Sequence, residues 1–361
     1  MSSKTFELPV VDLASLQKLM DRDPLPASVV DAIGQAFDRC GFAAVINHGL
    51  KSIPRCKTAS TAWFRSPLTE KMSVAANGEP FGYFPMFSES LNSLEPPPEG
   101  LPAPDLREAF SMGPQHDPTA RLQQVLQEKT NLREVADFCF SKTPWPDQMQ
   151  KGDCRVAGEF CDSLKCFYEE ASCLGQNLLR CVAKAMGLDE RHFDQGSAAQ
   201  EHTNSGRAIW YPKLTEAPLP NQARCGAHAD SGALTLLYCG APGLEIQLPG
   251  SSEWVPVESP PGSLVINIGE LAARATKGRW RSTPHRVPAP SSLDSAENVD
   301  RLVLVLFVIL APDFPVDESG LTQGEYTISR FKRWGRVVKS EGETENEIAR
   351  EQNGVNGKTA K

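Results

Sequence analysis

The feature that most constrains the fold of this chain is a change of pattern near residue 205. From there on, short apolar segments alternate with turns that are rich in proline and glycine. Strands separated by turn signals in this way are typical of an antiparallel sandwich or barrel. The segments that we expect to form strands are Ala208–Tyr211, Ala233–Tyr238, Leu244–Leu248, Leu264–Ile268 and Leu302–Leu310.

The first half of the chain is dominated by helical periodicity. Apolar residues recur every three or four positions over Asp153–Met186, which predicts a long helix with Asp153 as its N-cap and Gly187 just past its end. Shorter helices are expected over Ser28–Arg39 and Lys57–Arg65. Residues 80–118 are rich in proline, glycine and serine, and we expect them to form a long irregular excursion.

These patterns predict an α+β fold with a mainly β core, built as one catalytic unit. Residues 1–195 would form a helical and strand region that wraps the β core of residues 200–315. A C-terminal helix is expected at 316–340, and a polar tail at 341–361 is predicted to be disordered.

Composition narrows the class of protein. The 37 basic and 45 acidic residues give a net charge of −8, which argues against nucleic-acid binding as the main activity. No segment has the length and apolarity of a membrane span or a signal peptide. The ten cysteines form no C-x-x-C pair and are interpreted as reduced, so we expect a cytoplasmic protein. The sequence does not predict the oligomeric state.

Two H-x-D tripeptides are candidate metal ligands. His192 follows the long helix in a polar segment, and we interpret it as solvated. His228 and Asp230 precede a run of strands, where residues two apart point to the same face of a sheet. A third ligand must come from another strand, and His285 is the candidate.

Two histidines and one carboxylate leave about three coordination positions open, which suits non-haem Fe(II) that binds a cosubstrate and O₂. The alternative is that His228 and His285 are independent core residues, each buried and hydrogen-bonded. The β pattern between the two histidines, and the segment that follows them, favour the metal site.

That following segment is an apolar strand introduced by Arg301. Strand alternation places Arg301, Val303, Val305 and Phe307 on one face. The guanidinium of Arg301 would pair with the carboxylate of a small molecule in a dry pocket. The alternative is an arginine at the edge of a sheet with its head in water.

Together these residues resemble the iron- and 2-oxoglutarate-dependent dioxygenases of the isopenicillin N synthase-like family. The resemblance covers most of the chain. The segments that carry it are Leu8–Leu13, Cys40–Leu50, Phe64–Lys71, Asp105–Phe110, Pro261–Gly269, Gly278–Val287 and Glu325–Phe331.

The resemblance implies a double-stranded β-helix (jelly roll) with iron on His228, Asp230 and His285. Arg301 would pair with the distal carboxylate of 2-oxoglutarate, and Tyr211 matches a family tyrosine that contacts this cosubstrate. The implied function is oxidation of a small-molecule metabolite with O₂, by hydroxylation, desaturation or cyclisation.

Two residues depart from the family pattern. The usual R-x-S sequence reads Arg301-Leu302-Val303, so Val303 would border the cosubstrate where the family offers a hydroxyl, and Ile209 stands where an asparagine is expected. Losing a donor to a charged acceptor costs on the order of 1.5–3 kcal/mol unless another group replaces it. The departures leave the metal assignment intact and weaken the cosubstrate assignment.

Three alternatives therefore stay open: an Fe(II) oxidase of the same fold that needs no 2-oxoglutarate, a catalytically silent jelly-roll binding protein, and a zinc hydrolase on the same ligands. The sequence does not identify the substrate. Aromatic residues that are candidates for its pocket are Tyr83, Phe84, Phe110, Tyr238 and Phe307.

Overall fold

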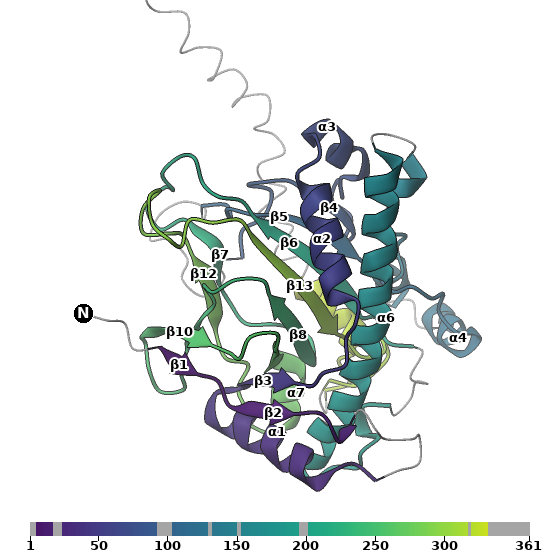
Figure 1. The fold of residues 1–361 in the computed structure, drawn as a ribbon. Coiled ribbons are helices and arrows are strands. Elements are labelled where there is room, and N and C mark those ends of the chain that lie inside the picture. Colours follow the sequence, from purple (N-terminus) through teal and green to yellow (C-terminus); the bar gives the residue numbers. More distant parts are fainter. Residues whose placement is uncertain are drawn as a thin grey trace, which may run out of the picture.

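The structure is a computed structural model that describes residues 5–16, 24–91, 103–128, 132–149, 153–194, 201–316 and 319–330. Figure 1 shows a β core flanked on one side by the long helix α6 (Cys154–Ala185) and by α2 (Ile53–Phe64), which pack against each other. The remaining helices are α1 (Ala27–Cys40), α3 (Leu68–Lys71), α4 (Ala120–Glu128), α5 (Arg133–Cys139) and α7 (Glu270–Ala275), together with a helix at 323–330. The α+β prediction is confirmed.

Two sheets make up the core. The larger has the strand order β2 (Val10–Asp12), β3 (Phe42–Ile46), β11 (Leu264–Ile268), β8 (Leu234–Cys239), β13 (Arg301–Val308), β6 (Ser205–Tyr211), β5 (Glu108–Met112), β4 (Gly82–Phe84). The smaller has the order β1 (Phe6–Glu7), β10 (Trp254–Glu258), β9 (Glu245–Gln247), β12 (His285–Pro288), β7 (Ala223–His228). Strands from both halves of the chain thus share the large sheet.

Strand β13 shows how the sheet separates two environments. Its residues Leu302, Leu304, Leu306 and Val308 pack into the hydrophobic cluster that includes α6. Val303 and Val305 pack instead with Cys225 and Val287 of the small sheet. The predicted common face of Arg301, Val303, Val305 and Phe307 is therefore confirmed, and it faces the space between the sheets.

The long predicted helix is confirmed as α6. The carboxylate of Asp153 accepts hydrogen bonds from the backbone N–H groups of Arg155 and Val156, which satisfies two donors that the first turn leaves free. Gly187, just past the C-terminal end, has φ 78°, a left-handed conformation that glycine adopts without a steric penalty.

The described parts of residues 80–118, which are 80–91 and 103–118, are more regular than the sequence predicts. They contain β4 and β5, which extend the large sheet beyond β6. All five residues of β5 are buried, so the alternation of polar and apolar residues that marks a half-exposed strand is missing. Helix α2 also begins at Ile53, before the expected Lys57, because Pro54 fits the first turn of a helix.

Parts of the C-terminal predictions cannot be compared with the structure. The helix at 323–330 lies within the segment predicted at 316–340, whereas residues 331–340 and the predicted tail at 341–361 lie outside the described residues. None of the helices in the described ranges combines the length and the apolarity that a bilayer crossing requires.

Candidate active site

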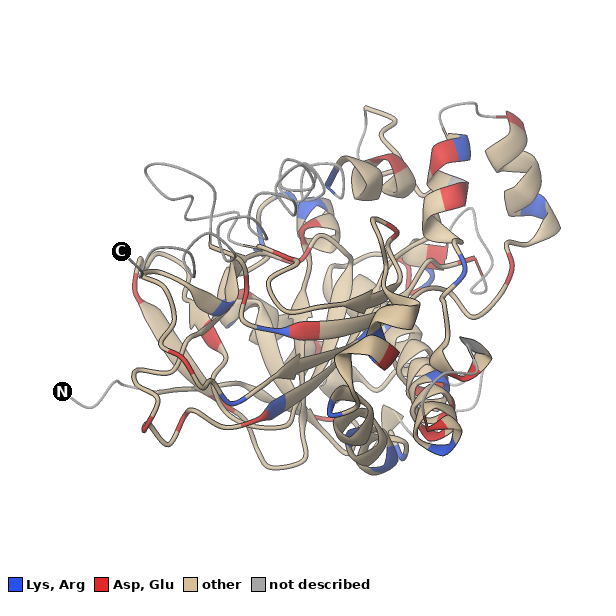
Figure 2. Ribbon diagram, turned by 90° about the horizontal axis from the view of Figure 1, so that it is seen from above, with Lys and Arg blue, Asp and Glu red and all other residues tan. Residues whose placement is uncertain are grey.

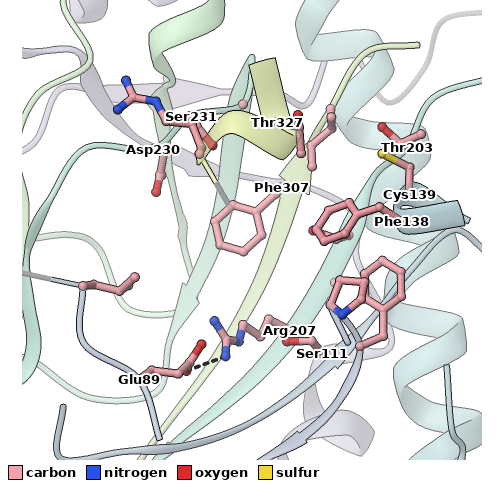
Figure 3. A pocket seen from close by; sticks show the side chains of 18 of the residues that line it. Glu89, Ser111, Phe138, Cys139, Thr203, Arg207, Asp230, Ser231, Phe307 and Thr327 are labelled. Atoms are coloured by element: carbon pink, nitrogen blue, oxygen red, sulfur yellow. Dashed lines mark hydrogen bonds and ion pairs between the residues drawn. The ribbon is translucent and has the colours of Figure 1, made fainter. Parts of the chain in front are cut away.

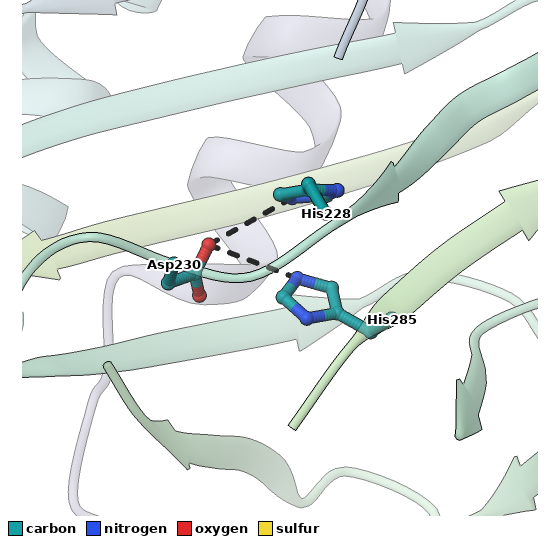
Figure 4. A group of neighbouring side chains, drawn as sticks. All are labelled: His228, Asp230 and His285. Atoms are coloured by element: carbon teal, nitrogen blue, oxygen red, sulfur yellow. Dashed lines mark ion pairs between the residues drawn. The ribbon is translucent and has the colours of Figure 1, made fainter. Parts of the chain in front are cut away.

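Three side chains converge where the two strands β7 and β12 meet. His228 is the last residue of β7, Asp230 follows two positions later, and His285 begins β12. The Nε2 atoms of both histidines lie 3.7 Å from Asp230 Oδ1 (Figure 4). One ligand atom from each of the three lies within 4.8 Å of the others, and among the described residues this is the single such group of three or more.

Backbone carbonyls set the orientation of both imidazole rings. His228 Nδ1 lies 2.8 Å from the carbonyl oxygen of Gly226, and His285 Nδ1 lies 3.3 Å from that of Thr283. A carbonyl oxygen can only accept, so each Nδ1 donates and each Nε2 keeps its lone pair. Histidines that bind a metal through Nε2 are usually held in this way.

The carboxylate of Asp230 is fixed by two donors on neighbouring strands. Its Oδ2 accepts from Thr235 Oγ1 at 2.6 Å and from Asn267 Nδ2 at 2.8 Å. Thr235 and Asn267 are register partners in β8 and β11. Because Oδ2 is occupied, Oδ1 is left facing the two histidines. The sequence analysis did not identify either residue. Each is a polar residue in an otherwise apolar strand, and this pattern could have indicated a role at the site.

The protonation states suit a divalent cation. Burial opposes the charge of Asp230, but His285, His228 and the two hydrogen bonds outweigh it and hold the pKa of this carboxyl below its ordinary value. Burial lowers the pKa of His285 to about 4. At neutral pH the site therefore offers an ionised carboxylate and an uncharged His285 imidazole, and metal ligands need these forms.

The turn that carries Asp230 is held by close backbone packing. Its carbonyl oxygen accepts from the backbone N–H of Glu270 at 2.7 Å and from Ser282 Oγ at 3.3 Å. A Cβ atom on Gly269 would lie 2.1 Å from the carbonyl oxygen of Gly232. Only glycine permits this approach, so Gly269 helps to place the ligand loop.

An inner cavity of about 70 Å³ extends from the triad toward Arg301 and Tyr211. Arg301 is 2% exposed, its Nε donates to the carbonyl oxygen of Ala241 at 3.0 Å, and its guanidinium lies 5.0 Å from the ring centre of Tyr211. Its Nη1 is buried without a hydrogen-bond partner, and within the described ranges no ion pair to a carboxylate involves it. A buried, uncompensated guanidinium is costly, so this cavity suits a ligand with a carboxylate.

An outer cavity of about 190 Å³ adjoins the inner one. The residues that line both are Leu91, Arg207, His228, Asp230 and Phe307. Figure 3 shows the ring of Phe307 between Asp230 and the Arg207–Glu89 pair, with Phe138, Cys139 and Thr203 on another side. The triad therefore lies where a carboxylate-binding cavity meets a larger, mostly apolar one.

Two family models account for most of the chain. The N-terminal model of the non-haem dioxygenases in morphine synthesis matches residues 8–135, and the model of the 2OG-Fe(II) oxygenase superfamily matches residues 203–309. The chain belongs to the 2OG-Fe(II) oxygenases. It is an oxidoreductase of the Fe(II)- and 2-oxoglutarate-dependent class, as the sequence predicts, and the triad supplies a donor set that fits Fe(II).

Curated relatives of this oxygenase span nearly its whole length. Validamycin A dioxygenase from Streptomyces hygroscopicus subsp. limoneus is 27% identical over 86% of this chain and 78% of the relative. Flavanone 3-dioxygenase 2 from Oryza sativa subsp. japonica is 26% identical over 92% of this chain and 85% of the relative.

Solved structures share the fold. A Neurospora crassa protein in complex with alpha-KG and thymine superposes with a TM-score of 0.68 at 22% identity, over 90% of this chain and 96% of that one. JOX2 in complex with 2OG, Fe and JA gives a TM-score of 0.64 at 18% identity, over 91% and 86%. The two-sheet architecture agrees with the predicted jelly roll, which is the fold of these oxygenases, and the described strands form no closed barrel.

The two departures of this oxygenase from the family pattern lie side by side. Val303 and Ile209 are register partners on β13 and β6, next to the pair formed by Arg301 and Tyr211. All four line the inner cavity. On the other side of β13, the register partner of Val303 is Cys239. The register partners of Val303 on both neighbouring strands therefore lack a hydroxyl group.

The aromatic residues predicted for the substrate pocket divide into two groups. Phe84 and Phe307 line the outer cavity. Tyr83, Phe110 and Tyr238 do not: they belong to the hydrophobic cluster on the helical side of the large sheet, and Tyr83 donates to Glu108 there. Their assignment to the pocket is corrected, because strand alternation turns them away from the space between the sheets.

The second H-x-D tripeptide lies apart from the triad of His228, Asp230 and His285. His192 begins a 3-10 turn, is half-buried, and its ring contacts Phe193 and Phe314 edge-on. It is packed rather than fully solvated, which corrects that expectation, but it does not belong to the metal-ligand group.

Proposed function

We propose that this oxygenase holds Fe(II) through His228, Asp230 and His285, and that Arg301 binds the distal carboxylate of 2-oxoglutarate. The observation that carries the proposal is the shared inner cavity. It brings an oriented His-Asp-His set and a buried guanidinium with a free Nη1 to opposite parts of one small space. 2-Oxoglutarate carries a metal-chelating group at one end and a carboxylate at the other, which matches this arrangement.

Each residue of the chain has a defined part in the proposed reaction. Fe(II) held by His228, Asp230 and His285 would supply the redox chemistry of a reaction with O₂ and 2-oxoglutarate. Asp230 offsets part of the metal charge, and Arg301 neutralises the cosubstrate carboxylate. The ring of Tyr211 supports the Arg301 guanidinium. The apolar side chains of the inner wall, such as Val303 and Val305, exclude water from the reacting groups.

The proposed substrate is a small metabolite that enters the outer cavity and is hydroxylated, desaturated or cyclised. The names of the validamycin and flavanone relatives, both small molecules, support this class. In Figure 2 basic and acidic segments are interspersed over the described ribbon, an arrangement that does not favour a nucleic acid. All ten cysteines lie in described ranges and none forms a disulfide, which supports the reducing cytoplasm as the compartment.

A second candidate is an Fe(II) oxidase that takes its electrons from the substrate and needs no 2-oxoglutarate. The observation in its favour is the pair Val303 and Ile209, which replaces two polar groups at the cosubstrate cavity. The presence of Arg301 without an ion pair to a carboxylate in the described part of the chain favours the 2-oxoglutarate-dependent function.

One titration tests the proposal. The purified protein is loaded anaerobically with Fe(II), and 2-oxoglutarate is added while the weak charge-transfer absorption of the chelate is followed. The proposal expects saturable absorption, and production of succinate when O₂ is admitted. Absence of both, with iron bound, would favour the oxidase instead.

A further inference from the structure

The outer cavity is lined by two arginines that the proposed reaction does not use, Arg207 and Arg330. Arg330 forms an ion pair with Glu270, whereas Arg207 keeps a buried N–H without an acceptor. Arg207 in β6 lines both cavities, and its guanidinium packs over the ring of Phe84 at 4.8 Å. Its Nη2 donates to Glu89 at 2.6 Å, whereas its Nε is buried and makes no hydrogen bond. A buried N–H without an acceptor costs free energy, so this group has the capacity to bind a further acceptor.

The carboxylate of Glu89 is shared between two cations. Besides Arg207, it lies 3.3 Å from the guanidinium of Arg107, which is 2% exposed. Asp105 is the other carboxyl group near Arg107, at 3.3 Å, and burial raises the pKa of Asp105 and so disfavours its charge. Glu89 is therefore shared between two guanidinium groups and does not pair with Arg207 alone.

The rest of the wall also favours an acidic ligand. The carboxylates that line the outer cavity are Glu89 and Asp230, and Asp230 is committed to the metal. Ser111 lines the cavity directly opposite Arg207 in the register of β5 and β6, so its hydroxyl is a second donor beside the guanidinium (Figure 3). A guanidinium and a hydroxyl side by side match the two oxygens of a carboxylate.

The size and polarity of the remaining lining restrict the body of the ligand. Most of the remaining lining is apolar, including Phe84, Leu91, Phe138, Phe307 and Ile309. The hydroxyl side chains of Thr203, Ser205, Ser231 and Thr327 lie among them. A cavity of roughly 150 Å³ with apolar walls accommodates benzene. The 190 Å³ here therefore suits one ring with a short side chain.

We propose that the substrate of this oxygenase is a small apolar acid, and that Arg207, assisted by Ser111, binds its carboxylate. The inference rests on the proposed function only in placing the substrate next to the triad. It assigns Arg301 to the carboxylate of the cosubstrate and Arg207 to that of the substrate.

The test uses three probes with one skeleton: 3-phenylpropanoate, its primary amide, and 3-phenylpropylamine. Binding to the anaerobic protein loaded with Fe(II) and 2-oxoglutarate is measured by calorimetry. We expect the acid to bind at least tenfold more tightly than the amide, and the amine to bind least. Equal affinity for acid and amide, preference for the amine, or no binding of the acid overturns the proposal.

Variants identify the group responsible. Arg207→Gln should abolish the preference for the acid over the amide, and Arg207→Lys should keep part of that preference. Ser111→Ala should lower the affinity for the acid by a few fold. Glu89→Gln should tighten acid binding, because it removes the carboxylate that competes for Arg207. Unchanged acid affinity in Arg207→Gln overturns the assignment. If that variant does not fold by circular dichroism, weaker acid binding in Glu89→Gln overturns it instead.

Failure of the proposed function is a separate outcome. The proposed function fails if the wild-type protein shows no charge-transfer absorption band with 2-oxoglutarate. The comparison of acid with amide is then made without cosubstrate on the wild type, Arg207→Gln and Arg301→Gln. A preference that is lost in Arg207→Gln and kept in Arg301→Gln still assigns recognition of the acid to Arg207.

Discussion

His228 and His285 are direct register partners on the antiparallel strands β7 and β12, with ring centroids 4.2 Å apart. The pairing becomes irregular immediately afterwards, between His285 and Val287. A slip of one residue would turn His285 to the opposite face of its sheet, because side chains alternate along a strand. The hydrogen bonds of these two strands therefore determine whether the metal-ligand set exists.

Loss of any one ligand should remove the metal without unfolding the protein. We expect His228→Ala, Asp230→Ala and His285→Ala each to lose most bound Fe(II), because two ligands hold the ion far less well than three. Iron is measured by a chromogenic chelator after anaerobic desalting, and folding by circular dichroism. His192→Ala is the matched control and should keep its iron. Stoichiometric iron in folded Asp230→Ala would contradict the assignment.

The donors to Asp230 should tune metal affinity without touching the metal. Thr235→Val keeps the shape of the side chain and removes the hydroxyl that donates to Oδ2. We expect its Fe(II) affinity to fall by about tenfold, within the usual range of 10–100-fold for such partners. Thr235→Ser restores the hydroxyl and should recover most of the affinity. A Thr235→Val protein that is destabilised but binds Fe(II) normally would show that the hydroxyl serves only the fold.

Arg301 should affect the cosubstrate and leave the metal in place. We expect Arg301→Ala to keep its iron but to lose the charge-transfer absorption with 2-oxoglutarate, because the distal carboxylate loses its charged partner. Arg301→Lys retains the charge without the planar fork and should bind with intermediate affinity. Anaerobic titration of the three proteins measures this. Wild-type affinity in Arg301→Ala would remove this residue from the cosubstrate site.

Stability should fall in mildly acidic solution because of a histidine outside the site. Burial, with a contribution from His116, lowers the pKa of His202 to about 4. The unfolded chain takes up the proton near pH 6.5, so the neutral folded form loses stability as pH falls from 6.5 toward 4. The loss between pH 7 and pH 5 is about 2 kcal/mol.

A variant isolates this contribution. In the wild type, Nδ1 of His202 accepts a hydrogen bond from the backbone N–H of Asn204. His202→Asn keeps an acceptor for this N–H. Urea unfolding at pH 7 and pH 5 measures both proteins. The variant should be less sensitive to pH by about the same 2 kcal/mol, and equal sensitivity in the two proteins would show that His202 is not responsible.

The sequence predicts the parts of this protein that depend on local periodicity and on the family motif. The face shared by Arg301, Val303 and Val305 follows from strand alternation alone, and α6 from the spacing of its apolar residues. The coming together of His228 and His285 across 57 positions rests on the pairing of two short strands that carry no clear pattern of their own. The family resemblance, rather than periodicity, made that prediction specific.

The residues that surround the ligands were harder to predict because their roles depend on long-range register. Asn267 reaches Asp230 only because β11 pairs with β8, and Arg207 meets Glu89 across 118 positions. Tyr83 and Phe110 are aromatic, as Phe84 is, and the sequence alone does not separate the three. In the structure Tyr83 and Phe110 pack on the helical side of the large sheet, whereas Phe84 lines the outer cavity. Which aromatic residue faces the substrate is therefore determined by the tertiary placement of β4 and β5.

The most specific prediction concerns Val303, which is 2% exposed and lines the inner cavity on the same face as Arg301. Its register partners, Ile209 and Cys239, offer no hydroxyl to the distal carboxylate. Tyr238, the residue before Cys239 on β8, packs on the other face of the sheet and offers no hydroxyl there either. The carboxylate should thus depend on Arg301 to an unusual degree.

Val303→Ser should therefore tighten binding of 2-oxoglutarate by up to about tenfold, or ~1.4 kcal/mol, because the new hydroxyl donates to a charged acceptor in a dry cavity. Val303→Ala is the matched control: it removes nearly the same volume without adding a donor, and it should bind equally or more weakly than the wild type. Anaerobic titration of the three Fe(II)-loaded proteins separates the hydroxyl from the lost packing. If Val303→Ser and Val303→Ala behave alike, another group such as Tyr211 already satisfies the carboxylate. If the wild type binds only at many millimolar and Val303→Ser is no tighter, the inner cavity serves a different cosubstrate.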